Sequence, residues 1–173
     1  AGTNQQIQFN QNGIFAGDSS LVYVYSLYGF QQGYLTTASA NYAHAEGGLT
    51  EAKGQGSHAE GSRTIASGSN SHAEGEYTIA IGNYSHAEGR GNSLLDATVA
   101  QGNHSHAEGD RTYAIGNASH AEGLGTTAFG YSSHAEGLAT YAYGGSSHAE
   151  GRFTSSSGDW SHAEGEETNA VGQ

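Results

Sequence analysis

Small and polar side chains alternate along most of this chain with a fixed period. The pentapeptide Ser-His-Ala-Glu-Gly recurs nine times between residues 43 and 165, with Ala in place of Ser in the first copy. A looser Thr-x-Ala-x-Gly motif begins seven residues after the start of a copy, as at residues 112–116, except after the copy at residue 85. Alternation within each half predicts β-strands, because neighbouring side chains of a strand point to opposite faces. The Gly-x-x steps between the halves predict tight turns with positive φ.

The spacing of the motif predicts how these strands are arranged. The motif histidines follow a 14-residue period, as His44, His58 and His72 show, with one longer interval between His86 and His106. A short fixed period is typical of a solenoid, here with two five-residue strands and two turns in each coil. The predicted fold class is therefore all-β, a parallel β-roll or β-helix solenoid of 14-residue coils. Some ten coils, spaced as parallel strands are, make a rod of roughly 45 Å.

The alternation also assigns an inner face and an outer face to each coil. Ser, Ala and Gly share the inner face, and His and Glu share the outer one. Ordering one residue costs about 1–2 kcal/mol of backbone entropy, whereas burying one methylene returns about 0.8 kcal/mol. We therefore expect a lone coil to be unstable and its outward faces to be buried against partner chains. The alanines of the roll interior are Ala59, Ala73, Ala87, Ala107, Ala121, Ala135, Ala149 and Ala163.

Residues 1–28 follow a different pattern and are predicted to form an N-terminal β-hairpin or cap. Residues 6–10 and 21–25 have the composition of strands. Asn12-Gly13 and Gly17-Asp18 lie between them and are turn signals.

Residues 29–43 lead into the repeat, and residues 36–40 already resemble a degenerate half-repeat. Residues 43–173 form the repeat domain, with six extra residues near 91–97. We expect this insertion to form a protruding loop, with Leu94 and Leu95 packed on a neighbouring coil or chain. Contact with a receptor is the alternative interpretation of the loop.

Composition excludes several classes of function. The chain has 17 acidic residues against 5 Lys and Arg, a formal net charge of −12, and no Cys. Nucleic acids and anionic membrane surfaces attract Lys and Arg, so neither is an expected partner. No apolar stretch approaches the roughly 18 residues that a membrane-spanning helix needs, which predicts no membrane insertion. The chain begins without Met and stops within a repeat, which indicates a piece of a longer protein.

The paired half-repeats of residues 36–173 resemble the head repeat of trimeric autotransporter adhesins, the YadA-like head. This resemblance implies a left-handed parallel β-roll, with three rolls packed around a threefold axis as a homotrimer. The adhesin motif has aliphatic residues facing that axis where this chain has His and Glu. The SHAEG form of the repeat, joined to residues 3–18, is more similar to phage tail-fibre proteins.

These resemblances imply a structural role outside the cell. The first hypothesis is a shaft segment of a phage tail fibre, on the virion, that contributes to host-surface attachment. The alternative is the head of a bacterial trimeric surface adhesin. An enzyme is the least supported class, because no Asp/Glu pair or nucleophile stands apart from the repeat. We therefore expect neither catalytic residues nor a cofactor.

The His and Glu positions never vary, whereas the outward positions of the other half-repeat change from coil to coil, as Ile79/Ile81 and Ser155/Ser157 show. An unvarying face is expected to meet an unvarying environment, which a homotrimer provides. We therefore predict an interchain ladder of His and Glu. Its residues are His44, Glu46, His58, Glu60, His72, Glu74, His86, Glu88, His106, Glu108, His120, Glu122, His134, Glu136, His148, Glu150, His162 and Glu164.

Three further hypotheses concern this ladder. Glu can favour imidazolium, which predicts a stability maximum in mildly acidic solution; if burial dominates, His stays neutral and the maximum moves to neutral or higher pH. Threefold rings of His could instead bind a transition metal, but we expect no metal. In a reversed orientation, His and Glu would face solvent and the variable half would face the axis.

A host cell-surface glycan or protein is the expected ligand of such a fibre. Aromatic side chains can stack on sugars, although coil ends and chain seams can also use them. The candidate surface contacts are Leu94, Leu95, Tyr141, Tyr143 and Trp160.

Overall fold

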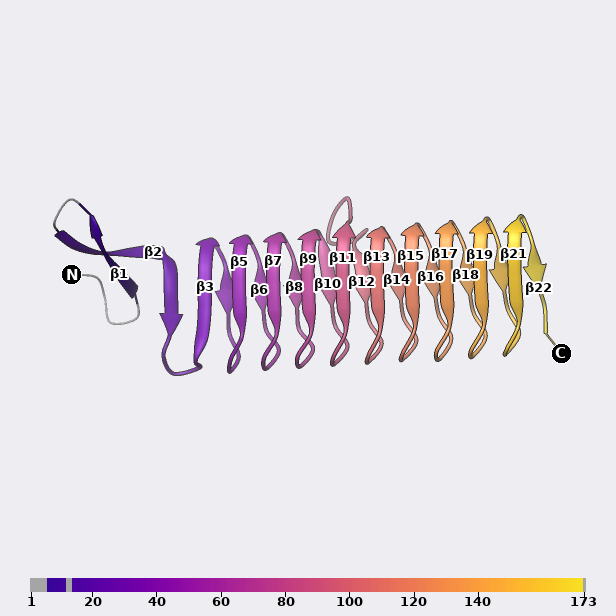
Figure 1. Ribbon diagram of the computed structural model, residues 1–173, viewed down its shortest axis with the longest axis horizontal. Coiled ribbons are helices and arrows are strands. Elements are labelled where there is room, and N and C mark those ends of the chain that lie inside the picture. The colour runs from indigo at the N-terminus through magenta and orange to yellow at the C-terminus, as the bar shows by residue number, and fades with distance from the viewer. Residues whose placement is uncertain (1–5, 12–13, 173) are drawn as a thin grey trace.

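The structure is a computed structural model that describes residues 6–11 and 14–172. All regular secondary structure in this part of the chain is β-strand, and the strands stack into a parallel solenoid (Figure 1). The predicted β-roll of 14-residue coils is therefore confirmed. Within the described residues, no helix is long and apolar enough to cross a membrane.

The strands form two sheets, one on each side of the roll. The long-strand sheet has 12 strands. They are β1 (Gln6–Gln11), β2 (Ile14–Val24), β3 (Gly29–Tyr34), β5 (His44–Gly48), β7 (His58–Ser62), β9 (His72–Glu76), β11 (His86–Arg90), β13 (His106–Asp110), β15 (His120–Leu124), β17 (His134–Leu138), β19 (His148–Arg152) and β21 (His162–Glu166).

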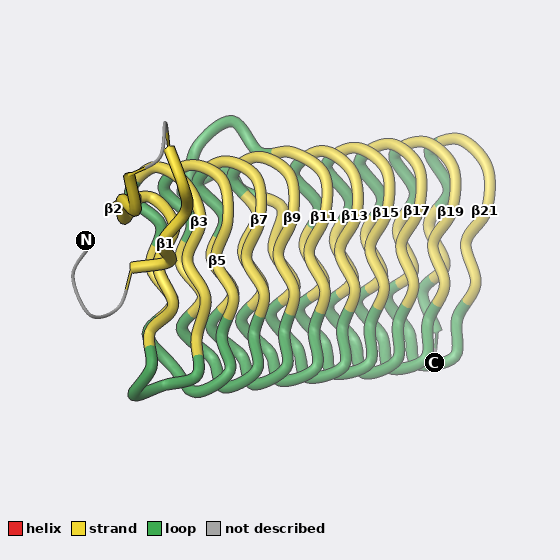
Figure 2. Tube along the Cα trace, turned by 60° about the vertical axis from the view of Figure 1, so that its left-hand side comes forward, coloured by secondary structure: helices red, strands yellow, loops and turns green. Residues whose placement is uncertain are grey.

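The short-strand sheet has 10 strands. They are β4 (Thr37–Ala38), β6 (Glu51–Ala52), β8 (Ile65–Ala66), β10 (Thr78–Ala80), β12 (Thr98–Ala100), β14 (Tyr113–Ala114), β16 (Thr127–Ala128), β18 (Tyr141–Ala142), β20 (Ser155–Ser156) and β22 (Asn169–Ala170). Figure 2 shows that the coils keep the same outline along the rod.

The strands of the second half-repeat are two or three residues long, so the prediction of five-residue strands there is wrong. The chain bends directly after the alanine of this half. In one coil, the backbone N–H groups of Lys53 and Gly54 both donate to the carbonyl of Ala66, over 2.8 and 3.2 Å. Two donors on one carbonyl end the regular strand pairing at that point.

Equivalent residues of successive coils lie side by side. His86 pairs with His106 and Ala87 with Ala107, even though these two coils are separated by the long interval. Residues 91–97 therefore leave the solenoid as a protruding loop between β11 and β12 (Figure 1). This insertion loop is held at its base, where Gly91 N–H donates to the carbonyl of Glu76 over 2.8 Å.

Small side chains fill the inside of the roll. The interior alanines named above are 0–4% exposed, and the threonines of the second half-repeat, such as Thr112, are fully buried. The motif serine closes the preceding turn, as Ser105 does by donating from Oγ to the carbonyl of Gly102 over 2.6 Å. The same carbonyl also accepts the backbone N–H of Ser105 over 3.3 Å, so the hydroxyl adds a second, shorter hydrogen bond to the turn.

The glycine of SHAEG does not lie on the inner face, contrary to the prediction. Gly109, for example, is partly accessible and has a φ of 110°. A Cβ on Gly109 would lie 2.2 Å from the carbonyl oxygen of Gly123 in the next coil. Glycine is required here because the backbones of adjacent coils approach too closely for any side chain.

The N-terminal region extends the long-strand sheet. β1 and β2 pair antiparallel, β2 and β3 pair antiparallel, and β3 then pairs parallel with β5. Coil stacking thus begins at Gly29. The predicted turn at Gly17-Asp18 is wrong, since β2 runs through it and the register shifts there as a bulge. The predicted turn at Asn12-Gly13 lies outside the described residues.

Candidate functional site

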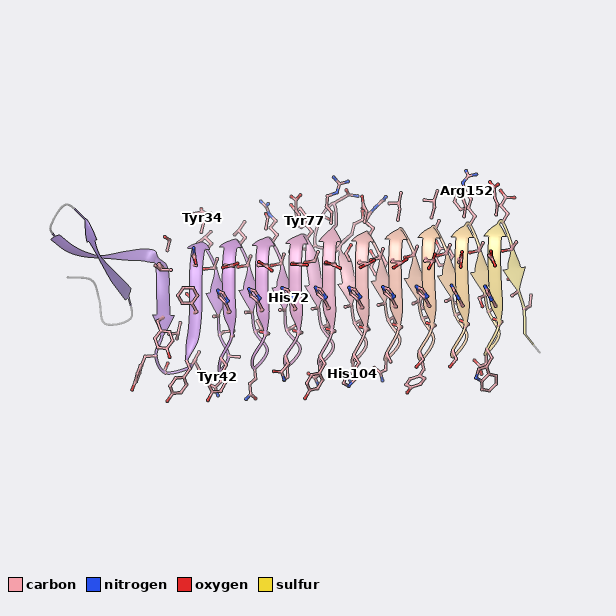
Figure 3. The ribbon with its side chains drawn as sticks, in the orientation of Figure 1. Tyr34, Tyr42, His72, Tyr77, His104 and Arg152 are labelled. Atoms are coloured by element: carbon pink, nitrogen blue, oxygen red, sulfur yellow. The ribbon has the colours of Figure 1, made fainter. Side chains whose placement is uncertain are left out.

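The nine motif histidines form a continuous column on the outer face of the long-strand sheet. Their ring centroids are 4.5–4.9 Å apart, and the rings are within 5° of parallel except for one pair at 23°. Figure 3 shows His72 within this column. Phe30 of β3 ends the column, with its ring edge-on to His44 at 5.1 Å. In-register pairing produces this stacking, because equivalent residues repeat at the strand spacing.

The motif glutamates form a second column beside the histidines. From His72 to His106, the imidazole approaches the carboxylate of the preceding coil, as between His72 Nε2 and Glu60 Oε1 at 3.2 Å. In the C-terminal coils it approaches the carboxylate of its own coil, as between His120 Nε2 and Glu122 Oε2 at 3.6 Å. These contacts lie within one chain, and their side chains are about one-third exposed. Such pairs each contribute about 0–1 kcal/mol.

Many of the imidazole nitrogens in this column are shielded from solvent and have no hydrogen-bond partner in the described part of the chain. A buried polar atom without a partner costs about 1–3 kcal/mol. The Nε2 atoms concerned are those of His44, His58, His86, His106, His120, His134 and His148.

Burial and stacking favour the neutral form of four histidines in the column. Loss of solvation is the main cause of the lowered pKa of these imidazoles, and the charge on neighbouring histidines lowers it further. The effect of burial therefore dominates over the attraction of the glutamates. The histidines with a lowered pKa are His58, His86, His120 and His134.

Five glutamates of the column differ in the direction in which their pKa is shifted. A shared hydrogen bond with Glu74, together with burial, raises the pKa of Glu88 to about 7. The same hydrogen bond lowers the pKa of Glu74. Burial is the main cause of the raised pKa of Glu60 and Glu122. Burial also raises the pKa of Glu108, but hydrogen bonds with its neighbouring glutamates outweigh this effect and lower the pKa below its usual value. Raised and lowered values thus alternate from coil to coil.

The two columns bring together residue types that bind transition metals. In sets such as His58, Glu60 and His72, one ligand atom from each residue lies within 4.8 Å of the others. Imidazole and carboxylate together suit zinc, copper or nickel. The lone pair of each imidazole lies in the ring plane, so two parallel rings one coil apart must tilt before they can share an ion.

The other predicted contact residues lie on separate surfaces. Tyr141 and Tyr143 lie on the outer face of the short-strand sheet, with ring centroids 5.9 Å apart. Leu95 is 97% exposed and does not pack on a neighbouring coil of its own chain, so only its packing on a neighbouring chain stays a prediction. Leu94 lines a shallow depression that includes Leu49 and Ile65. Trp160 is 82% exposed at a turn.

Sequence reasoning predicted positive φ in the Gly-x-x steps but missed that residues other than glycine adopt it there. Except before Thr98, where the insertion replaces the turn, the residue directly before each motif Ser or Thr has a positive φ of about 50–65°, and most of these residues are not glycine. They lie along both edges of the roll, with Tyr77 near one edge and Tyr42 and His104 near the other (Figure 3). The detectable signal was position, since each directly precedes the Ser or Thr of a half-repeat.

Some of these side chains stack along the edges of the roll. The rings of Tyr84 and His104 are parallel at 5.0 Å, and the Arg63 guanidinium lies 5.3 Å from the centre of the Tyr77 ring. Such contacts offset part of the strain of the left-handed backbone.

Comparison with protein families supports the predicted adhesin resemblance. The family described as YadA head domain repeat (2 copies) matches residues 52–71, 59–85, 96–119, 107–133 and 121–147. A comparison with curated proteins gave no significant match. The coils within residues 52–85 and 96–147 are therefore similar to the YadA head domain repeat.

Proposed function

We propose that this chain is a head segment of an extracellular homotrimeric adhesin, in which the columns of His and Glu lie between the chains. The main support for this proposal is the difference between the outer faces of the two sheets. The face of the long-strand sheet repeats His and Glu without variation, whereas the face of the short-strand sheet changes in every coil. In a trimer, the unvarying face meets its own copies and the varied face remains available to ligands.

The energetics of a single roll support assembly through the His and Glu columns. Alanine, serine, threonine and glycine supply the interior, so burial inside one roll contributes little per residue. The half-exposed columns leave imidazole nitrogens without partners. Groups from two neighbouring chains can supply those partners and bury the stacked rings. Assembly then stabilises each chain, and we expect no stable monomer.

The role is adhesive and structural rather than enzymatic. His and Glu recur at every coil with nearly the same neighbours, so no single pair differs from the rest as a catalytic pair would. The alternative is a shaft segment of a phage tail fibre, favoured by the SHAEG form of the repeat together with residues 3–18. Both alternatives place the segment outside the cell, on a bacterial surface or on a virion.

Native mass spectrometry and sedimentation velocity at micromolar concentration test the assembly. We expect a trimer. Replacing Glu108 and Glu122 together with Arg should prevent its assembly, because stacked guanidinium groups would face their own copies. Replacing Ser155 and Ser157 with Arg on the other face is the matched control and should leave the trimer intact. A folded monomer, or a trimer disrupted by the control alone, would overturn the proposal.

A further inference from the structure

The insertion loop forms one wall of a groove on the face of the short-strand sheet. This groove has a volume of about 360 Å³ and is open to solvent. Asp96 of the loop and Arg111 of the following coil line one end. Leucine side chains of the adjacent turns, including Leu138, line one side. Tyr113, Thr127 and Tyr141, which belong to three successive coils, also line the groove.

Hydrogen bonds fix the loop in this position. Asn92 N–H donates to the carbonyl of Asp96 over 2.9 Å, and Asn92 Nδ2 donates to Asp96 Oδ2 over the same distance. The buried Thr98 connects both sides of the insertion, because its Oγ1 donates to the carbonyl of Arg90 and accepts from Arg111 N–H. The groove is therefore preformed, as binding sites for small molecules usually are.

Tyr113, Thr127 and Tyr141 occupy the same position in three successive coils, so the threonine lies between the two tyrosines. Tyr113 pairs in register with Thr127, and Thr127 pairs with Tyr141. Two strand spacings separate the tyrosines by roughly 10 Å, about the length of two linked sugar rings. Thr127 is only 7% exposed. Its short side chain therefore forms the bottom of the groove, with one tyrosine ring on each side.

The charges around the groove are balanced, unlike those of the whole chain. Arg111 Nε donates to Asp110 Oδ1 over 3.0 Å, and Arg90 pairs with the other oxygen of Asp110 at 3.0 Å. Burial and the nearby charge of Asp96 raise the pKa of the Tyr113 hydroxyl, which stays protonated as a donor. Two arginines and two aspartates give no net local charge. The groove thus offers planar polar groups and aromatic faces without attracting a charged ligand.

We infer that this groove binds a neutral oligosaccharide, with sugar rings on Tyr113 and Tyr141 and hydroxyl groups bonded to Asp96 and Arg111. Sugars present C–H faces that pack on aromatic rings and hydroxyls that need donors and acceptors. The inference names a ligand class for the attachment role and rests on the proposed adhesive function. It uses the varied face, which the trimer leaves accessible.

An array of neutral and acidic oligosaccharides, followed by calorimetry with each neutral oligosaccharide that binds, tests this inference. We expect the wild-type trimer to bind a neutral oligosaccharide. Tyr141→Ala should weaken this binding about tenfold, while Tyr141→Phe should retain it because the ring is kept. Tyr84→Ala is the control, since Tyr84 is exposed at a turn away from the groove.

Three results would overturn the inference: binding of acidic oligosaccharides only, binding of none, or neutral binding that survives Tyr113→Ala and Tyr141→Ala. The oligomeric state is measured on the same samples. A trimer without sugar binding contradicts only this inference, whereas a sugar-binding monomer contradicts only the proposed assembly.

Discussion

His72 Nε2 lies 3.2 Å from Glu60 Oε1, a carboxylate of the preceding coil rather than of its own. This contact joins two coils through side chains as well as through the sheet. We expect His72→Gln and Glu60→Gln to be non-additive, with a coupling of about 0.2–1 kcal/mol in thermal unfolding. His148→Gln combined with Glu60→Gln is the control and should be additive, because six coils separate these residues. Additivity at both pairs would show that the contact between His72 and Glu60 is energetically neutral.

Stability should depend on pH through Glu88. Its pKa is about 7 in the folded chain, above the usual 4.5, so the folded state holds the proton more tightly. This contribution is complete below pH 4.5 and is lost as pH rises through 7. Glu88→Gln removes this loss of stability at high pH and should be more stable than wild type at pH 8, by on the order of 1 kcal/mol. Near pH 4.5 the two proteins should unfold alike.

The contribution of four histidines to stability has the opposite pH dependence to that of Glu88. The lowered pKa of His58, His86, His120 and His134 means that the unfolded chain binds protons more tightly at these four residues. Their contribution is complete above pH 6.5 and is lost as pH falls through the folded value. Glu74→Gln is a second comparison, since the lowered pKa of Glu74 contributes stability above pH 4.5 that the variant lacks. Unfolding curves of the wild type, Glu88→Gln and Glu74→Gln from pH 4 to 9 separate these effects.

Replacing Ala107 with Leu should destabilise the protein by about 1–3 kcal/mol through overpacking. Ala107 is fully buried between the two sheets. The matched control is Gln101→Leu, at an exposed outward position where neighbouring coils carry Ile81 and Ile115. The control should melt as the wild type does. Equal melting of Ala107→Leu and the control would contradict a filled interior.

Two glycines separated by one residue should respond differently to alanine. A Cβ on Gly125 meets no atom within 4 Å, so only its φ of 66° opposes substitution, at a cost of about 1–2 kcal/mol. A Cβ on Gly123 would lie 2.2 Å from the carbonyl oxygen of Gly137. Gly123→Ala should therefore lower Tm much more than Gly125→Ala. Similar Tm values for the two variants would mean that adjacent coils can separate without loss.

The sequence was sufficient to predict the solenoid, because a sustained 14-residue period leaves few ways to pair the strands. The small interior followed from the alternation around residues such as Ala107 and Thr112. The insertion followed from the long interval between His86 and His106. Each of these features depends on which residues repeat and at what spacing.

Other features depend on distances that the repeat does not encode. The accessible position of Gly109 results from a close approach of two backbones, which alternation alone cannot show. The left-handed conformation of Tyr84 contradicts the usual preference for glycine there. The alternating pKa values of Glu74 and Glu88 arise from hydrogen bonding within a column of identical residues. The groove requires Asp96 and Arg111 to meet across the insertion, which only the folded loop provides.

The two columns of glycine also determine how the rod can change in length. At both Gly109 and Gly116, a Cβ would strike the carbonyl oxygen of the glycine in the next coil, so neighbouring coils must stay in register at two places. A gain or loss of a few residues within a strand would place a side chain at one of these contacts. Gain or loss of one whole coil keeps both. Evolution can therefore lengthen or shorten this rod in steps of about 4.8 Å, one coil at a time.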